Sequence, residues 1–252
     1  MLHTRLNDCS HDQSHASKGF SHWVLERGDI LTGMKQVRIC EYNSFRGEVD
    51  LRDDLSAHGF SLVLAGEARY TLRGKIHTLH KGDFLYVPPL EEYALATLGS
   101  KYRVLAIDAY HTSIDEHKVA PSVVRVSDRT KVDTPQGYSI LQEKILSRSE
   151  GSTISDISVT DFVAIKSYES RTLESDLMLY VLGGQAMLKV PYYDEHFAVG
   201  VGDLIRIPAR REFTLTVLEK PFQVFGLYSK PIPRVGEADN IYDEDELVEE
   251  SV

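Results

Sequence analysis

One sequence pattern occurs twice in this chain and decides its fold. The first copy reads Ser61-Leu-Val-Leu-Ala-Gly-Glu-Ala and is followed by Gly82-Asp-Phe-Leu-Tyr-Val-Pro. The second reads Leu179-Tyr-Val-Leu-Gly-Gly-Gln-Ala and is followed by Gly202-Asp-Leu-Ile-Arg-Ile-Pro. The copies are about 118 residues apart, and a repeat of that length indicates a duplicated domain rather than a solenoid.

Each residue type shared by the copies has a local physical reason. Gly66 ends an apolar strand where the chain must turn with a positive φ. The Gly82-Asp83 pair begins the next strand through a tight turn, in which the aspartate can bond nearby amides. Pro88 closes that strand because proline cannot donate to a β-ladder. The second copy carries the same residue types at Gly184, Gly202, Asp203 and Pro208.

The sequence on either side of the pattern extends the β interpretation to both halves of the chain. Short alternating apolar runs recur about every ten residues with Gly-rich turns between them, which is typical of β-sandwiches and barrels. No long amphipathic helical stretch competes with them. We therefore expect an all-β fold with a flexible arm (1–18), a first barrel (19–115), a connector with one strand near 123–126 (116–136), a second barrel (137–234) and an acidic tail (235–252).

Composition and charge exclude several classes of protein. The net charge is −10, but eight acids lie between Val235 and Val252, so the body carries only −2 and shows no basic footprint for nucleic acid. No apolar run reaches the roughly 18 residues that span a bilayer, and the polar N-terminus lacks the core of a secretory signal. Two cysteines without metal or disulfide spacing favour a reducing compartment. We expect a cytoplasmic protein with no nucleic-acid or membrane partner.

The repeated pattern resembles the cupin superfamily, over roughly residues 45–110 and 160–228. Val63-Leu-Ala-Gly66 and Val181-Leu-Gly-Gly184 match the first part of its "VLxG … GDxxxxP" signature. The resemblance implies two tandem cupin barrels, also described as double-stranded β-helices or jelly rolls. The first half is also similar to the sugar-sensing arm domain of AraC-type regulators, but no helix-turn-helix follows it.

Metal-binding cupins carry three histidines and a glutamate at fixed places in this signature, and this sequence departs from them. In the first half the glutamate position holds Gly59 and the last histidine position holds Tyr93. The second half has Leu177 and Phe213 at those places. The first two histidine positions fall within 52–55 and 170–173, which contain no histidine. A stable site usually needs three or more ligands, so we expect no bound metal and no other cofactor.

Strand parity then predicts what lines the first barrel. If the glutamate position faces inward, Gly59, Ser61, Val63 and Ala65 share that face, and Tyr93, Leu95 and Thr97 line it from another strand. This small, polar and aromatic lining predicts a pocket for a small organic ligand. The candidate ligand-binding residues are Asp54, Ser61, Tyr70, Tyr86, Tyr93 and Thr97. The alternative interpretation of Tyr93 is plain packing, and Leu177 and Phe213 are expected to be apolar core.

Three functions remain open at this point. The first is a metal-independent protein that binds a small carbohydrate-like or organic-acid ligand, with a regulatory role. The second is a cupin-type isomerase or epimerase, as the resemblance implies, with His58 and Tyr93 as the candidate acid and base. The third is an interaction scaffold. Whether the chain is an enzyme is left undecided, and a homodimer is compatible with the barrels.

Overall fold

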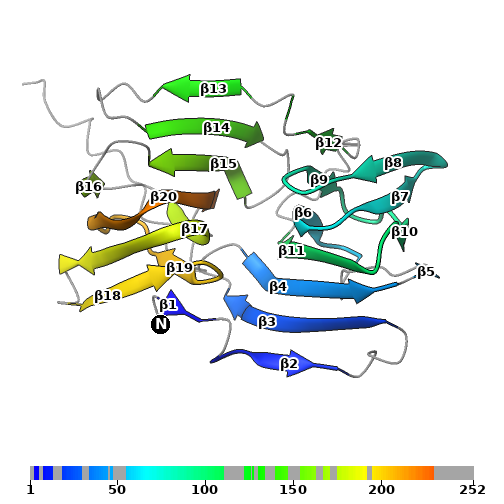
Figure 1. The fold of residues 1–252 in the computed structure, drawn as a ribbon, viewed down its shortest axis with the longest axis horizontal. Coiled ribbons are helices and arrows are strands. Elements are labelled where there is room, and N and C mark those ends of the chain that lie inside the picture. The colour runs from blue at the N-terminus through cyan, green and yellow to red at the C-terminus, as the bar shows by residue number, and fades with distance from the viewer. Residues whose placement is uncertain are drawn as a thin grey trace, which may run out of the picture.

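The computed structural model describes an all-β protein (Figure 1). No α-helix occurs in the described part of the chain, which comprises residues 3–5, 8–13, 19–29, 34–44, 46–47, 55–110, 122–125, 127, 130–133, 140–146, 154–162, 167–170, 175–191 and 195–229. The all-β expectation is therefore confirmed. Residues 235–252, the expected acidic tail, lie outside the described residues.

The N-terminal half is built from two antiparallel sheets. The four-stranded sheet has the order β5 (Arg46–Gly47), β10 (Tyr93–Thr97), β7 (Ala68–Leu72), β8 (Lys75–Leu79). The seven-stranded sheet has the order β12 (Ser122–Val124), β9 (Phe84–Val87), β6 (His58–Ala65), β11 (Lys101–Ala109), β4 (Met34–Asn43), β3 (Phe20–Asp29), β2 (Ser10–Asp12). Buried side chains from both sheets form what we call the N-terminal core, which includes Val63, Tyr70, Leu85, Tyr93, Leu95 and Val104.

The C-terminal half is one nine-stranded sheet that bends on itself. Its main path is β1 (His3–Thr4), β19 (Leu204–Ile207), β17 (Asp176–Val190), β20 (Phe213–Ser229), β15 (Ile154–Phe162), β14 (Ile140–Leu146), β13 (Thr130–Asp133). Off this path, β16 (Ser167–Ser170) pairs with β20 and β18 (Glu195–Gly200) pairs with β17. Its own buried cluster, the C-terminal core, includes Leu177, Leu179, Val181, Ile205, Phe213 and Val224.

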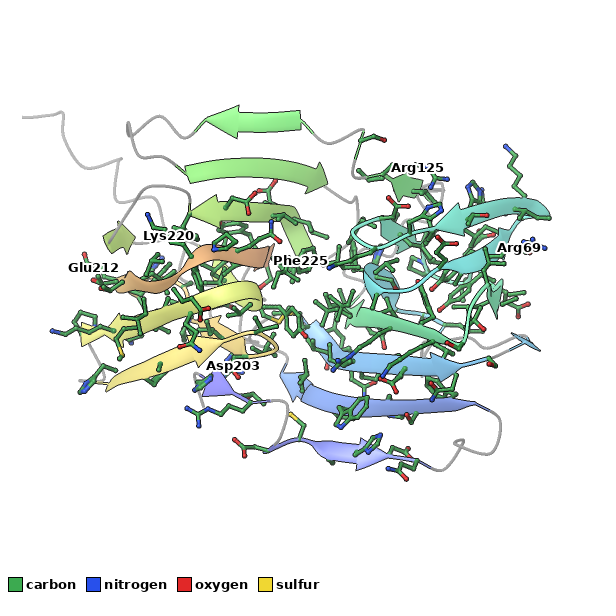
Figure 2. The ribbon with its side chains drawn as sticks, viewed as in Figure 1. Arg69, Arg125, Asp203, Glu212, Lys220 and Phe225 are labelled. Atoms are coloured by element: carbon green, nitrogen blue, oxygen red, sulfur yellow. The ribbon has the colours of Figure 1, made fainter. Side chains whose placement is uncertain are left out.

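A third apolar cluster lies where the two halves meet. This junction core combines side chains of the N-terminal half with side chains of the C-terminal half, among them Ile39, Phe60, Tyr86, Met178, Tyr180 and Phe225. The rings of Phe84 and Phe225, one from each half, have centroids 6.3 Å apart. Figure 2 labels Phe225. Each half therefore packs one sheet face inward on its own core and the opposite face against the other half.

The repeated Gly-Asp turn has the same hydrogen bonds in both halves. The Oδ2 atom of Asp83 accepts from the backbone amide of His80 at 2.9 Å, and Oδ2 of Asp203 accepts from that of Gly200 at 2.9 Å. The backbone φ angles of Gly82 and Gly202 are +88° and +92°. The expectation that these aspartates bond nearby amides is confirmed, and the turns match atom for atom.

The halves differ at the glycine that ends the first apolar run. Gly66 (φ +77°) separates β6 from β7 as expected, whereas Gly184 (φ +72°) lies inside the single long strand β17. The β17 register against β20 shifts between Val181 and Gly183 and again between Gly183 and Gln185. The strand therefore continues around a bend where the N-terminal half breaks into two strands.

Each half begins with a short strand that pairs with the other half. β1 pairs with β19 of the C-terminal half, and β12 pairs with β9 of the N-terminal half (Figure 1). Residues 3–4 and 10–12, expected in a flexible arm, are therefore paired strands. The expected connector strand near 123–126 is β12. Without β1 and β12, the outer edges of β19 and β9 would have unpaired backbone groups. Pairing with these edges explains why such short segments form strands.

Among the described residues there is no helical segment that could span a bilayer.

Candidate functional site

The alternation of strand β6 divides its side chains between two cores. Val63 belongs to the N-terminal core, whereas Phe60 and Leu62 belong to the junction core. Because strand side chains alternate, Gly59 and Ser61 share the inward face with Val63. The predicted inward face of β6 is in agreement with this division.

Four tyrosines meet inside the N-terminal half. Tyr42, Tyr70, Tyr93 and Tyr102 all belong to the N-terminal core. The rings of Tyr70 and Tyr93 have centroids 5.4 Å apart, and the hydroxyls of Tyr70 and Tyr102 are hydrogen-bonded at 3.1 Å. These side chains surround the position of Tyr93, where metal-binding cupins carry a histidine.

Burial keeps three of these phenols protonated. It raises the pKa of Tyr42, Tyr70 and Tyr102 well above the ordinary value, and the neighbouring phenols raise those of Tyr42 and Tyr70 further. The charge of Arg38 acts in the opposite direction on the pKa of Tyr42. At neutral pH this lining therefore offers hydroxyl donors rather than phenolate bases.

The candidate residues from the sequence fall into three groups. Ser61, Tyr70, Tyr93 and Thr97 are buried on the inward faces of β6, β7 and β10. Two others, His58 and Tyr86, lie on the face toward the junction core, where His58 Nδ1 and the Tyr86 hydroxyl are hydrogen-bonded at 2.9 Å. Asp54 lies outside the described residues.

This arrangement corrects two expectations from the sequence. Tyr86 does not line the N-terminal core, because its neighbours Leu85 and Val87 take the inward face of β9. His58 and Tyr93 lie on opposite faces of the sheet that carries β6, so the structure does not bring them together as an acid–base pair.

Three polar side chains on the inward face were not singled out from the sequence. Arg38 on β4 donates from Nη2 to Oδ2 of Asp108 on β11 at 2.6 Å, and the two side chains are only 3% and 6% exposed. Gln36 is 3% exposed, and its Nε2 has no hydrogen-bond partner among the described residues. The signal was present in the sequence: an arginine interrupts the apolar run of 37–40 and an aspartate directly follows that of 104–107, both at positions with inward parity.

The register brings these residues together with the glutamate position of the cupin pattern. Asp108 pairs with Gln36 on one side and with Gly59 on the other. Ala106 pairs with Arg38 and Ser61 in the same way. Four polar side chains and one glycine therefore occupy adjacent inward positions on β4, β11 and β6.

The matched positions of the C-terminal half are more apolar. Tyr228 pairs with Asp156 and Leu177, and Gly226 pairs with Ser158 and Leu179, in the same register as their counterparts. Leu177 and Leu179 replace Gly59 and Ser61, and no arginine stands in this set. Leu177 and Phe213 are buried in the C-terminal core, which confirms that they are apolar core residues.

The residues at the ligand positions of metal-binding cupins do not fit a metal. Gly59, Leu177 and Phe213 have no side-chain atom that can coordinate one, and Tyr93 is a phenol. Within the described ranges, no three His, Cys, Asp or Glu side chains gather in a group that could hold a metal ion.

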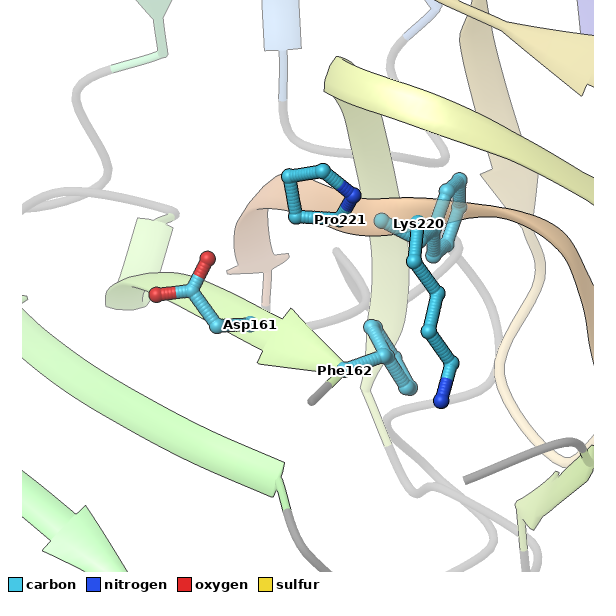
Figure 3. A pocket seen from close by; sticks show the side chains of 5 residues that line it. Asp161, Phe162, Lys220 and Pro221 are labelled. Carbon is cyan, nitrogen blue, oxygen red and sulfur yellow. The ribbon is translucent and has the colours of Figure 1, made fainter. Parts of the chain in front are cut away.

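A pocket of about 320 Å³ lies in the C-terminal half, away from this cluster (Figure 3). Its lining includes Phe162 and Phe222, whose rings are tilted at 48° with centroids 5.4 Å apart, and Lys220. Asp161 accepts a hydrogen bond from Gln223 Nε2 at 2.5 Å. The two rings belong to the C-terminal core, so the floor of this pocket is apolar.

Comparison with solved structures places the fold among cupin-type proteins. A putative glyoxylate-induced protein from Pseudomonas aeruginosa is similar with a TM-score of 0.72 at 18% identity, over 85% of this chain and 81% of that one. Protein Ylba from E. coli is similar with a TM-score of 0.69 at 14% identity, over 84% and 83%. Oxalate decarboxylase from Lactobacillus farciminis, in a formate complex, is similar with a TM-score of 0.70 at 12% identity, over 92% and 87%.

These likenesses establish the fold and not the activity. No family model and no curated protein matches the sequence. The chain thus has a cupin-type, jelly-roll fold, as its repeated pattern predicted.

Proposed function

We propose that this chain is a two-barrel cupin whose N-terminal half binds a small organic molecule without a protein-bound metal. In this proposal the C-terminal half serves as an apolar packing partner. The ligand is carbohydrate-like or an organic acid, and the role is binding, with regulation as its use in the cell.

One observation carries the proposal: the inward polar residues differ between the halves at matched register positions. Arg38 and Ser61 occupy the inward row of the N-terminal half where Ser158 and Leu179 stand in the C-terminal half. Burying an arginine costs free energy even when it is paired, so a purely structural core gains little from it. If the inward row of the N-terminal half contacts a polar ligand, this explains why the buried arginine occurs in that half only.

The remaining lining supports a small ligand. Gly59 contributes no side chain, and the phenols of Tyr70 and Tyr93 offer flat surfaces with hydroxyl donors. Sites for small molecules combine apolar walls with a few placed polar groups in this way. Two of the structural neighbours are named for small carboxylates, glyoxylate in one and oxalate in the other, which fits an organic acid.

Epimerase chemistry has no comparable support. It needs an acid and a base on opposite sides of one ligand. His58 is hydrogen-bonded to Tyr86 toward the junction core, and the phenols of the N-terminal core are held in their neutral form. Binding is therefore the function that the geometry supports best.

Calorimetric titration of the chelator-treated protein tests the proposal. Neutral sugars, sugar acids and small organic acids are titrated in turn, and we expect at least one class to bind with one site per chain. Tyr93→Phe copies the residue at the matched position, Phe213, and should weaken that binding while the fold is kept. Ser158→Ala, in the C-terminal half, is the control and should leave it unchanged. Absence of binding by all three classes would contradict the proposal.

A further inference from the structure

We infer that the ligand of the N-terminal half is a small carboxylate, held by Arg38 and Gln36 beside Gly59. This inference rests on the proposed function and specifies the chemistry of its ligand. It begins from the two most polar strands of the inward face, β4 and β11.

The position of the Arg38–Asp108 pair determines where the carboxylate of a ligand would bind. The 2.6 Å bond orients the guanidinium within the inward row, in which Ala106 lies between Arg38 and Ser61. A guanidinium has five N–H donors in a rigid fork, more than one carboxylate can accept. Arg38 can therefore hold Asp108 and a second carboxylate together, with Asp108 fixing its orientation.

A second, independent observation is that the buried amide nitrogen of Gln36 lacks a hydrogen-bond acceptor among the residues that the structure describes. Its side chain is 3% exposed, and its Nε2 has no hydrogen-bond partner in the described part of the chain. A buried amide donor without an acceptor is costly, and native proteins rarely keep one without a reason. The register places Gln36 opposite Asp108 and one inward position from Arg38, so one ligand oxygen near Gly59 can satisfy it.

The balance of donors and acceptors selects the chemical class. Arg38 only donates and the Gln36 amide nitrogen donates, whereas Asp108 already accepts from Arg38. The hydroxyls of Ser61 and Tyr93 can donate or accept. A carboxylate accepts only and carries the charge that a guanidinium prefers. A neutral sugar hydroxyl accepts a weaker hydrogen bond from a guanidinium than a carboxylate does, because it carries no charge. A phosphate carries more charge than this one arginine, already paired with Asp108, can balance.

Titration with matched ligands tests the inference. The probes are the sodium salts of the monocarboxylates glycolate and lactate, the corresponding neutral amides, inorganic phosphate and neutral monosaccharides. We expect one or more of the carboxylates to bind, and the amides, phosphate and sugars to bind at least about tenfold more weakly, because each loses a charge-assisted hydrogen bond or adds unbalanced charge.

Gln36→Leu separates recognition from packing. It removes the amide with little change in volume, so the ligand-free protein should unfold at the same or a higher temperature. The carboxylate affinity should fall about tenfold. If Gln36 has only a structural role, the variant instead lowers the unfolding temperature and leaves affinity unchanged, which would overturn its assignment as a ligand contact. Arg38→Lys keeps the charge without the fork and should also weaken binding.

The outcomes distinguish the inference from the proposal beneath it. Binding of a neutral sugar or of phosphate in preference to every carboxylate would overturn the carboxylate assignment and leave a small-molecule site in place. If none of these probes binds, and no sugar, sugar acid or organic acid of the broader titration binds either, the inference and the proposed function are both wrong. Carboxylate binding that is unaffected by Gln36→Leu and Arg38→Lys would place the ligand elsewhere and overturn this site.

Discussion

The Nε2 atom of His3 lies 3.1 Å from the Oδ2 atom of Asp203, so the first strand of the chain contacts the Gly-Asp turn of the opposite half. The atoms are within ion-pairing distance but are not aligned as a hydrogen bond. In the other half, Nη1 of Arg125 donates to Oδ2 of Asp83 at 3.1 Å. Each Gly-Asp turn is thus contacted by a side chain from a short strand or its end, His3 in β1 and Arg125 directly after β12. Figure 2 labels Arg125 in one half and Asp203 in the other.

Because β1 pairs with β19 of the C-terminal half, removing β1 should destabilise that half first. Deletion of residues 1–5 uncovers the edge of β19, so the β19 amides that point toward β1 should exchange with solvent faster. Strand β9 keeps its partner β12, and its amides should retain their protection. Hydrogen exchange followed by mass spectrometry gives the comparison. Equal acceleration in β9 and β19 would mean that the effect is not local to the exchanged strand.

Gly66 should tolerate no side chain, and Gly74 provides a matched control. Both have positive φ angles, +77° and +73°. A Cβ atom at Gly66 would lie 2.1 Å from the carbonyl oxygen of Lys101, whereas one at Gly74 meets nothing within 4 Å. We expect Gly74→Ala to cost about 1 kcal/mol from backbone strain alone, and Gly66→Ala to cost several times more. Urea denaturation measures both, and similar losses would contradict the close packing at Gly66.

The buried Arg38–Asp108 pair should show strong coupling. Asp108→Ala leaves the guanidinium buried without its carboxylate and should cost about 3 kcal/mol or more of stability. Arg38→Met combined with Asp108→Ala should cost less than the single Asp108→Ala change, because no charge is stranded. A double-mutant cycle by chemical denaturation gives the coupling. Additive single effects would show that the two side chains act independently.

The buried tyrosines predict a loss of stability at alkaline pH. Burial raises the pKa of Tyr42 and Tyr70 in the folded state above the unfolded value of about 10. Their contribution to stability is therefore complete below pH 10 and falls as pH rises above it, because only the unfolded phenols ionise freely. The loss should be on the order of 1 kcal/mol per pH unit for each such phenol.

Absorbance of phenolate against pH, recorded in native buffer and in denaturant, tests this directly. We expect a fraction of the tyrosines to titrate only when the protein unfolds. Full titration of the native protein near pH 10 would show that water reaches the N-terminal core.

Residue pattern was sufficient for much of the fold. The alternating runs and the paired Gly-Asp turns are local signals, and the structure places strands and positive φ angles where they indicated. The inward parity of β6 also followed from the pattern, since it depends only on the two-residue repeat. Strand β1 could not be found this way, because two residues carry no periodicity and its partner β19 is in the other half of the chain.

The candidate site was less accessible to sequence reasoning. Gly59 and Tyr93 occupy ligand positions of metal-binding cupins and could be named from the sequence for that reason. Both lie on inward faces in the structure. The pattern of metal-binding cupins gave no information on β4 and β11, which carry no such positions but supply Arg38 and Asp108. Tyr86 was assigned to the wrong face because nothing fixed the parity of β9 until the positions of Leu85 and Val87 were known.

A crystal structure of the chelator-treated protein with its best-binding small carboxylate tests the central claim most directly. The account predicts one ligand inside the N-terminal half, with a carboxylate oxygen within hydrogen-bonding distance of Arg38 and of the Gln36 amide. A metal ion coordinated in that half, or a ligand found only on the surface while side chains fill the space beside Gly59, would contradict it.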